Sequence, residues 1–309
     1  MKGILDLGEE ERPMFGKVLT AMVTPMREDM SVNYAEAERL ACYLADHGSD
    51  GIVVTGTTGE PATLTKDERL QMFEVVSKAV GSRCNVLANV GSYSTAESAA
   101  LAKKAAQYDI AGFMAVVPYY LKPPQEGMYK HFQTIAEAGG KPLIMYNIPS
   151  RTGVNMLPET VGRLAEVPNV VGLKEATGNM DQMSEFRRVL PPDFTIYSGE
   201  DSLLYPLVSL GANGLIGVAS HLVGERTQRM LELFWEGKSQ EALQIHLELM
   251  PLFKGIFVTT NPIPIKYLLN KLGFHVGGCR LPLTNPEPEE KVFLDRLFDD
   301  FAETMTRPD

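Results

Sequence analysis

The sequence predicts an α/β fold, a (β/α)8 TIM barrel with a C-terminal helical appendage. Short apolar runs alternate with longer amphipathic stretches from Val18 to about Trp235, which is the pattern of alternating strands and helices. The runs are apolar on both faces, as in a parallel sheet covered by helices. Eight such units fit a barrel in number and size. An open doubly wound sheet is the alternative, but no glycine fingerprint follows the first strand.

The predicted strands are rich in valine, isoleucine, leucine and alanine, and most end at glycine, proline or polar residues. In chain order they cover residues 17–25, 50–56, 85–91, 111–118, 142–149, 170–176, 194–200 and 214–220. In a barrel the functional groups lie at the carboxyl ends of the strands. The residues that follow these runs are therefore the first place to look for a site.

Helix-start signals occupy several of the segments between the strands. In a capping box, a Ser, Thr or Asn side chain and a Glu side chain three residues later satisfy each other's free backbone amides. Pro158 suits the first turn of another helix. Three capping boxes are predicted, namely Asn33 with Glu36, Thr65 with Glu68, and Ser94 with Glu97.

After Trp235 the pattern changes to helices only, which we predict over residues 239–256, 262–272 and 287–305. The last of these presents one apolar stripe, made of Phe293, Leu294, Leu297, Phe298, Phe301 and Met305. We therefore expect the chain to consist of an N-terminal extension over residues 1–15, a catalytic barrel over 16–237 and a helical domain over 238–309.

The composition excludes several classes of protein. The formal net charge is -10 and the isoelectric point is about 5.1, which disfavours a nucleic-acid partner because phosphate binding needs accumulated Lys and Arg. Cys42, Cys84 and Cys279 are too scattered for a disulfide framework or a zinc site. No apolar run reaches the ~18 residues of a membrane span, and the charged first fifteen residues do not form a signal peptide. We expect a cytoplasmic protein without a membrane partner.

Lys174 lies where the flanking residues predict a buried strand, in the run VVGLKEATG over residues 170–178. A lysine in a strand is commonly an exposed edge residue, but the sixth strand of a closed barrel has no edge. Burial disfavours the ammonium form and lowers a lysine pKa from about 10.4 by several units. The neutral amine is a nucleophile that forms an imine with a ketone or aldehyde. Lys174 is therefore the predicted imine-forming residue.

Polar residues after neighbouring strands would serve such an imine. Tyr146, at the end of the fifth strand, offers a phenol for proton transfer, although a satisfied core tyrosine is the alternative. Thr57 and Thr58, in a glycine-flanked turn, are either plain turn residues or part of a concavity that accepts a carboxylate. Arg151 is either a solvated loop charge or a bidentate carboxylate clamp. The five histidines lack metal-ligand spacing, so no catalytic metal is expected.

Six motifs in order make the chain similar to one enzyme family. Through these motifs the chain resembles the dihydrodipicolinate synthases, also called 4-hydroxy-tetrahydrodipicolinate synthases. The resemblance covers residues 16–285. These belong to the pyruvate-dependent superfamily that includes N-acetylneuraminate lyase. Any one motif alone would be a weak signal, but the combination is specific. The motifs are GTTGE at 56–60, PYY at 118–120, YNIPSRTG at 146–153, GLKEATG at 172–178, SGED at 198–201 and NPIPIK at 261–266.

The resemblance implies a Schiff-base mechanism without an organic cofactor. Lys174 would form an imine with pyruvate, and the resulting enamine would attack L-aspartate 4-semialdehyde to give 4-hydroxy-tetrahydrodipicolinate for lysine and diaminopimelate biosynthesis. Tyr146, Thr57 and Tyr120 would form a proton relay. Because the family counterpart of Tyr120 enters the site of a neighbouring subunit, a homo-oligomer is implied, either a dimer or a tetramer of tight dimers.

The same resemblance implies substrate-binding residues and leaves alternatives. Thr58 and backbone near Gly199 and Ile216 would hold pyruvate, and Arg151 would bind the carboxylate of the second substrate. A pyruvate-dependent aldolase or lyase of sialic acid or 2-keto-3-deoxy sugar acids would share the lysine, but such enzymes generally lack this arginine. Arg151 and Tyr120 therefore carry the substrate assignment. A catalytically silent barrel that binds a keto acid is a third interpretation, disfavoured because no key residue is missing.

The chain departs from the family where lysine-inhibited bacterial members have their allosteric site. Those members typically carry a Ser-Ala pair after GTTGE and histidines in the following helix. Positive charge at Lys66 and Arg69 would lie near the ammonium of the inhibitor, so weak or absent lysine inhibition is expected. The aligned candidate regulatory residues are Pro61, Ala62, Lys66, Arg69, Tyr93, Glu97 and Tyr119.

Overall fold

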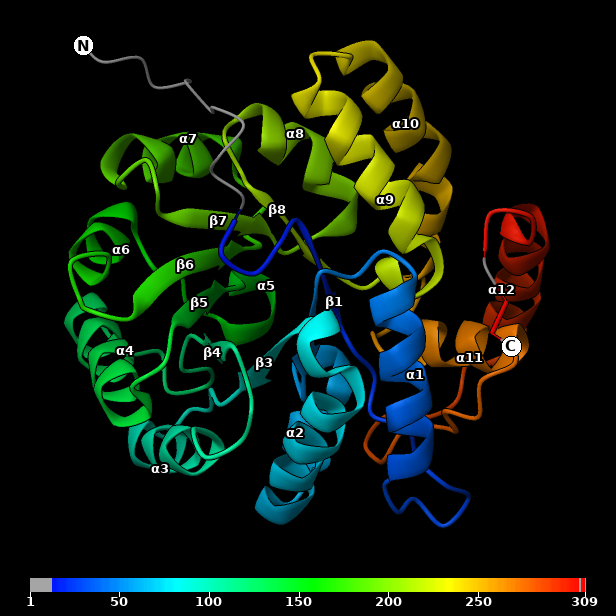
Figure 1. Cartoon of the computed structure of the whole chain (residues 1–309), viewed down its shortest axis with the longest axis horizontal. Helices are drawn as coiled ribbons and strands as arrows, with labels where there is room; N and C mark the ends of the chain where they lie inside the picture. Colours follow the sequence, from blue (N-terminus) through cyan, green and yellow to red (C-terminus); the bar gives the residue numbers. More distant parts are fainter. Residues whose placement is uncertain (1–12, 306, 309) are drawn as a thin grey trace. The chain divides into compact units, whose positions relative to one another are not determined.

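The computed structural model describes residues 13–305, 307 and 308. Most of the predicted N-terminal extension, residues 1–12, lies outside the described residues. Eight strands lie within the eight predicted runs, and Figure 1 follows them in chain order. They are β1 Val18–Ala21, β2 Gly51–Val54, β3 Asn85–Asn89, β4 Gly112–Val116, β5 Leu143–Asn147, β6 Val170–Glu175, β7 Thr195–Ser198 and β8 Gly214–Gly217.

The strand order is that of a closed barrel, from β1 to β8 in sequence, and the strands pair in parallel, as β5 does with β6. The predicted (β/α)8 fold is therefore confirmed. The strands are shorter than the predicted ranges because apolar residues continue past the strand ends. Met22 and Val23, for example, follow β1 and are buried without belonging to it.

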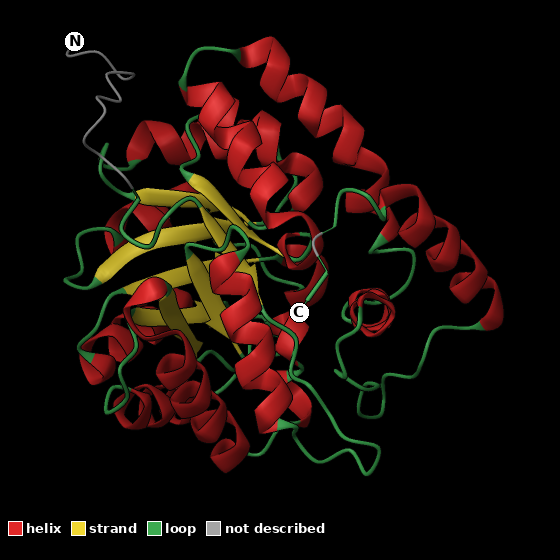
Figure 2. Cartoon of the chain, turned by 45° about the vertical axis from the view of Figure 1, so that its right-hand side comes forward, coloured by secondary structure: helices red, strands yellow, loops and turns green. Residues whose placement is uncertain are grey.

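The chain divides into two compact units. Among the described residues, the first unit comprises 13–17, 90–107 and 111–215. It contains β4 to β7, and Figure 2 distinguishes its yellow strands from the red helices. Pro158 begins a helix as predicted. The helices are α3 Thr95–Ala105, α4 Gln125–Gly139, α5 Pro149–Thr152, α6 Pro158–Leu164, α7 Met180–Val189 and α8 Leu204–Ser209.

The second unit comprises residues 18–89, 108–110 and 216–308 and contains β1 to β3. Its helices α9 and α10 lie side by side (Figure 1). No helix among the described residues is both long and apolar enough to cross a membrane. The division into a barrel and a helical domain at residue 237 stays a prediction. The helices are α1 Tyr34–Asp46, α2 Lys66–Val80, α9 Ser220–Trp235, α10 Ser239–Gly255, α11 Ile263–Leu272 and α12 Pro288–Phe301.

The last helix is shorter than its apolar pattern predicted. It ends at Phe301 and not at residue 305. Phe293 is 42% exposed, so it lies outside the buried face, whereas Met305 is buried beyond the helix end. An apolar stripe therefore predicted burial better than it predicted the helix terminus. The residues of the stripe that α12 buries are Leu294, Leu297 and Phe298.

Of the three predicted capping boxes, the one that begins at Thr65 is complete. Asn33 and Ser94 accept the expected backbone N–H, but the structure records no return bond from the Glu side chain in either. In α1 the carboxylate of Glu36 instead accepts a hydrogen bond from the amide of His275, 2.7 Å away. The predictions for these two boxes were wrong, and for Glu36 the reason is a competing donor that residue spacing does not reveal.

Candidate active site

Lys174 lies on β6 with a neighbouring strand on each side. Its register partners are Tyr146 on β5 and Tyr197 on β7. Its side chain lies in the interior of the protein, because only 5% of the residue is exposed. The expectation of a buried, non-edge lysine is therefore confirmed.

Burial lowers the pKa of the Lys174 amine from 10.5 to about 7. Loss of hydration is the largest cause, because a charged ammonium is disfavoured where water is excluded. The positive charge of Arg151 lowers the pKa further, while the negative charges of Asp201 and Glu200 oppose the shift. About half of the amine is thus neutral and nucleophilic near pH 7.

Tyr146 accompanies Lys174 at the carboxyl ends of β5 and β6. The amine nitrogen lies 4.2 Å from the centroid of the tyrosine ring, and Tyr146 is only 4% exposed. A contact with the ring face favours the charged amine, so burial outweighs it in setting the pKa. The first unit thus contains a dry amine next to a phenol, which is the pair that imine chemistry needs.

Gly199 follows β7 and lies against the stem of Lys174. A Cβ at this position would lie 2.7 Å from the Cβ of Ala176 and 3.2 Å from Cε of Lys174. Its amide donates to the carbonyl of Glu175 at 2.6 Å. A side chain at position 199 would therefore collide with Ala176 and crowd the stem of Lys174.

Glu175 is a buried acid that sequence reasoning did not single out. It is 1% exposed, and burial raises the pKa of its carboxyl from 4.5 to about 7. One carboxylate oxygen accepts the amide of Thr177 at 2.7 Å, and its register partner is Asn147 on β5. An acid within an apolar run, directly after Lys174, was the signal that could have identified it.

In the second unit, Thr57 and Thr58 lie in a short 3-10 turn, Thr57–Gly59, that follows β2. Thr58 is buried, and its hydroxyl oxygen accepts a hydrogen bond from Nδ2 of Asn261 at 3.0 Å. The hydroxyl of Thr24 donates to the carbonyl of Gly59 at 2.7 Å. The turn is thus fixed by side chains from other parts of the unit, and Asn261 is a contact that the sequence did not predict.

The turn ends in a buried ion pair between Glu60 and Lys266. The Nζ of Lys266, on α11, lies 2.8 Å from Oε1 of Glu60, and both side chains are almost fully buried. Glu60 has a positive φ of 56°, a conformation that non-glycine residues rarely adopt. The NPIPIK motif by itself gives no role to its lysine. In the structure that lysine, Lys266, holds the GTTGE turn through Glu60.

The other predicted site residues are placed as follows. Arg151 is exposed on α5, and its charge acts on the Lys174 amine. Tyr120 follows β4 and is 86% exposed. Ile216 is buried on β8 in the second unit. No group of three or more His, Cys, Asp or Glu residues in the described chain could hold a metal ion.

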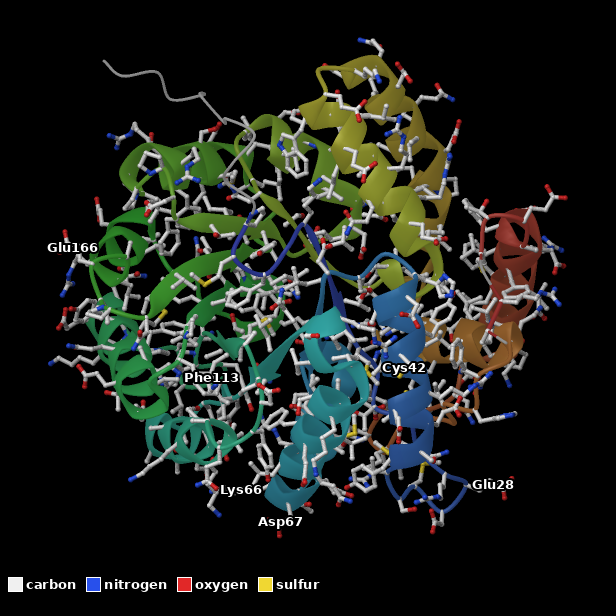
Figure 3. The ribbon with its side chains drawn as sticks, viewed as in Figure 1. Glu28, Cys42, Lys66, Asp67, Phe113 and Glu166 are labelled. Atoms are coloured by element: carbon white, nitrogen blue, oxygen red, sulfur yellow. The ribbon has the colours of Figure 1, made fainter. Side chains whose placement is uncertain are left out.

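The candidate regulatory residues fall into two groups. In the first unit the rings of Tyr93 and Tyr119 meet edge to face, 5.5 Å apart, and Glu97 is exposed. In the second unit Lys66 projects from the start of α2, as Figure 3 shows. Arg69 instead donates to the carbonyl of Asn89 at 2.6 Å. Pro61 and Ala62 lie in a 3-10 turn before α2.

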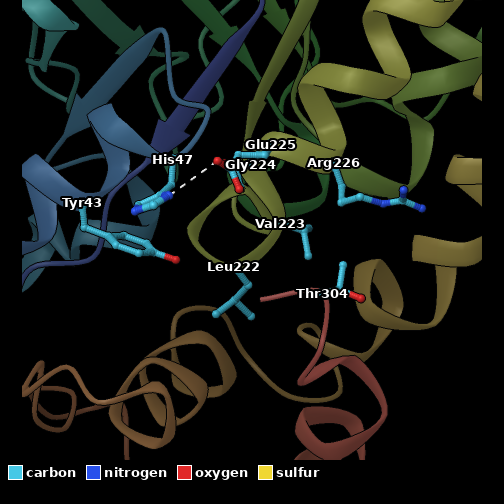
Figure 4. Close-up of a pocket in the computed structure, with 9 residues that line it drawn as sticks. Tyr43, His47, Leu222, Val223, Gly224, Glu225, Arg226 and Thr304 are labelled. Carbon is cyan, nitrogen blue, oxygen red and sulfur yellow. Dashed lines mark ion pairs between the residues drawn. The ribbon is translucent and has the colours of Figure 1, made fainter. Parts of the chain in front are cut away.

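A small pocket in the second unit is unrelated to these residues. It lies between α1, the start of α9 and Thr304, and Figure 4 shows the ion pair of His47 with Glu225 beside it. Its volume is about 10 Å³, which is space for about one water molecule. None of the predicted site residues lines it.

Comparisons with known proteins agree on one family. The model of the dihydrodipicolinate synthetase family matches residues 14–299. A 4-hydroxy-tetrahydrodipicolinate synthase of Desulforamulus reducens is 53% identical over 277 residues, 89% of this chain and 94% of the relative. A solved DHDPS from Cyanidioschyzon merolae with lysine bound has a TM-score of 0.93 at 47% identity, covering 95% of this chain and 100% of the other. The chloride-inhibited dihydrodipicolinate synthase from Acinetobacter baumannii, complexed with pyruvate, has a TM-score of 0.89 at 35% identity, covering 93% and 98%.

Proposed function

Because the chain belongs to the dihydrodipicolinate synthetase family, we propose that Lys174 and the residues around it carry out the family's reaction. The protein is a lyase of the class I aldolase type, and it condenses pyruvate with L-aspartate 4-semialdehyde to give 4-hydroxy-tetrahydrodipicolinate in lysine and diaminopimelate biosynthesis. The observation that carries the residue assignment is the buried amine of Lys174, with its pKa of about 7.

Lys174 acts as the nucleophile. Its neutral amine adds to the keto carbon of pyruvate, water leaves, and loss of a methyl proton converts the imine to an enamine. The enamine carbon attacks the aldehyde of the second substrate. The amine of that substrate then displaces Lys174 by transimination as the ring closes. The imine nitrogen is the electron sink, so this series of reaction steps needs no organic cofactor.

We assign the proton transfers to Tyr146, Thr57 and Tyr120. The assignment of Tyr146 is supported by its burial and by the 4.2 Å between its ring centroid and the Lys174 nitrogen. Tyr120 is 86% exposed, so the described chain leaves it open to enter the site of a second copy. The relay would then require a dimer, and a tetramer of two such dimers is the proposed assembly.

Two groups of residues bind the substrates in this proposal. Thr58 supplies a hydroxyl to the carboxylate of pyruvate, and backbone near Gly199 and near Ile216 also takes part in holding pyruvate. Arg151 binds the carboxylate of the semialdehyde, because an exposed guanidinium forms bidentate bonds with carboxylates. Its charge is close enough to act on the Lys174 amine, which suits a residue at the mouth of the site.

The rate of imine formation with pyruvate is expected to rise with pH and to level off above about pH 7. Only the neutral amine attacks, and the lowered pKa of Lys174 makes half of it available near that pH. The measurement is the initial rate of borohydride-trapped adduct from pH 5.5 to 9.5, with pyruvate below saturation. A rate that keeps rising about tenfold per pH unit up to pH 9 would show an unshifted lysine.

Arg151→Ala tests the substrate assignment. The variant is expected to form the pyruvate adduct on Lys174 but to lose about 100-fold or more in kcat/KM for aspartate 4-semialdehyde, because a charge-assisted bidentate contact is removed. A coupled assay with the semialdehyde measures the loss.

Arg188→Ala is the matched control, because this arginine is exposed on α7 and pairs with Glu185. It should leave both steps unchanged. Equal losses of the adduct and of semialdehyde turnover in Arg151→Ala would assign the arginine to pyruvate instead. Faster turnover of 2-keto-3-deoxy acids than of the semialdehyde would favour the sugar-acid aldolase alternative.

L-Lysine is expected to inhibit this protein weakly or not at all. The positive charge of Lys66, exposed at the start of α2, would repel the ammonium of the inhibitor, and the guanidinium of Arg69 lies one turn further along the same helix. The relative from Cyanidioschyzon merolae was solved with lysine bound, so the two proteins should differ in this respect. Half-inhibition of the purified enzyme at submillimolar L-lysine would contradict this prediction. We also propose that the enzyme is cytoplasmic.

A further inference from the structure

The turn that carries Thr57 and Thr58 is tied to a distant segment of the chain. Asn261, just before α11, contacts Thr58 across a sequence separation of 203 residues. Lys266, on α11, contacts Glu60 across 206 residues. Two side chains of the NPIPIK motif thus reach the GTTGE turn, although neither belongs to the proposed catalytic set.

The contact of Lys266 with Glu60 fixes the position of the turn. An ammonium group has three donors, and all three are used: they go to Oε1 of Glu60 at 2.8 Å, to the carbonyl of Thr24 at 3.0 Å and to the carbonyl of Gly278. The second oxygen of Glu60 accepts the amide of Arg280 at 2.9 Å. A buried ion pair with its donors satisfied resists displacement, so the turn is held rigidly.

The contact of Asn261 with Thr58 determines which way the hydroxyl proton points. Nδ2 of Asn261 donates to Oγ1 of Thr58 at 3.0 Å. Because the oxygen accepts this bond, the threonine proton is left for another acceptor. Asn261 is 5% exposed and Thr58 is 2% exposed, so water does not compete for this hydrogen bond.

The other polar atom of the Asn261 amide is its carbonyl oxygen, Oδ1. In the recorded orientation, Oδ1 of Asn261 is buried without a hydrogen-bond partner in the described chain. Reversal of the amide would place Oδ1 against the hydroxyl of Thr58, which would then donate its proton to Asn261. A buried carbonyl oxygen without a partner is more common in proteins than a buried N–H group without one.

We propose that Asn261 is a positioning residue that keeps the Thr58 hydroxyl as a hydrogen-bond donor to the carboxylate of the substrate. The inference rests on the proposed function, in which Thr58 binds that carboxylate. It assigns to the segment before α11 a part in substrate recognition, which Asn261 exerts through Thr58 without acting on the reacting atoms.

The test measures the KM for pyruvate of two variants, Asn261→Asp and Asn261→Ala. The first is nearly isosteric but presents only acceptors, so it captures the threonine proton, and the second removes the donor without adding charge. Both are expected to raise the KM for pyruvate about tenfold or more, the size of a lost hydrogen bond to a charged group. The KM for aspartate 4-semialdehyde should stay within about twofold.

A double-mutant cycle with Thr58→Val separates positioning from general damage. Once the hydroxyl is absent, Asn261→Ala should raise the KM for pyruvate by less than about twofold, because there is no proton left to orient. The matched control is Gln244→Ala, which removes an exposed amide on α10 that donates to the carboxylate of Glu248. This control should leave the KM for pyruvate unchanged.

The outcomes are distinguishable. An unchanged KM for pyruvate in Asn261→Asp would overturn the inference, as would a rise in Asn261→Asp that Asn261→Ala does not share, since charge repulsion alone would explain it. Equal effects of Asn261→Ala with and without the Thr58 hydroxyl would also overturn it. A failure of the proposed function has a different signature, because the wild-type protein would then form no borohydride-trapped adduct at Lys174.

Discussion

Replacing Lys174 with alanine is expected to abolish the covalent pyruvate adduct and to lower the rate of condensation by about 10⁴-fold or more, as removal of a catalytic nucleophile commonly does. Lys174 combines a buried amine, a pKa lowered to about 7 and a tyrosine ring centroid 4.2 Å from its nitrogen. Borohydride treatment with pyruvate, followed by peptide mass spectrometry, gives the measurement.

Lys103→Ala is the matched control for this experiment, because Lys103 is exposed on α3 in the same unit. It should retain both the adduct and the activity. An adduct of normal yield in Lys174→Ala would show that the nucleophile lies elsewhere.

Loss of the folded state should not obscure the result of Lys174→Ala. The buried amine of Lys174 destabilises the folded protein, and the variant lacks that amine. The pKa of Lys174 is lower in the folded state than in the unfolded state, so the unfolded state binds more protons above about pH 7, and stability rises with pH between the two pKa values. Lys174→Ala removes this penalty, which is largest below pH 7. The variant should therefore remain folded at the pH of the assay.

Replacing Lys266 with methionine is expected to lower the free energy of unfolding by about 3–5 kcal/mol. The substitution leaves the carboxylate of Glu60, itself only 4% exposed, without the cation that lies 2.8 Å from it. Removing one partner of a buried pair is costly because the other charge stays desolvated. The midpoint of denaturant unfolding, followed by circular dichroism, measures the change.

Two further variants make this prediction specific. In the double variant Lys266→Met with Glu60→Gln, at least half of the lost stability should return, because no uncompensated charge remains buried. Lys78→Met removes an exposed ion pair with Glu74 on α2 and should change stability by about 0.5 kcal/mol or less. A loss of similar size in Lys266→Met and Lys78→Met would show that burial of the first pair carries no special weight.

Local pattern was sufficient to predict the strands of the fold. Each of the eight strands lies within its predicted run, because an apolar segment of that length is recognisable from its own residues. The predicted terminus of α12 was wrong, since Met305 is apolar and buried yet lies beyond the helix. The capping boxes at Asn33 and Ser94 were predicted from spacing, but the partner of a glutamate depends on which donors the fold brings near.

By itself the sequence determined that a lysine would be buried in the sixth strand, since the hydrophobic residues around Lys174 lie next to it in the chain. Only the tertiary structure decided the pKa of that amine and which side chains hold the other proposed site residues in place. The pKa of Lys174 depends first on its burial by the fold and then on the charges of Asp201, Arg151 and Glu200, which come from other elements. The contact of Asn261 with Thr58 joins residues that are 203 positions apart. Burial and electrostatic effects depend on distance in space, and separation along the chain does not reveal which distant side chains will meet.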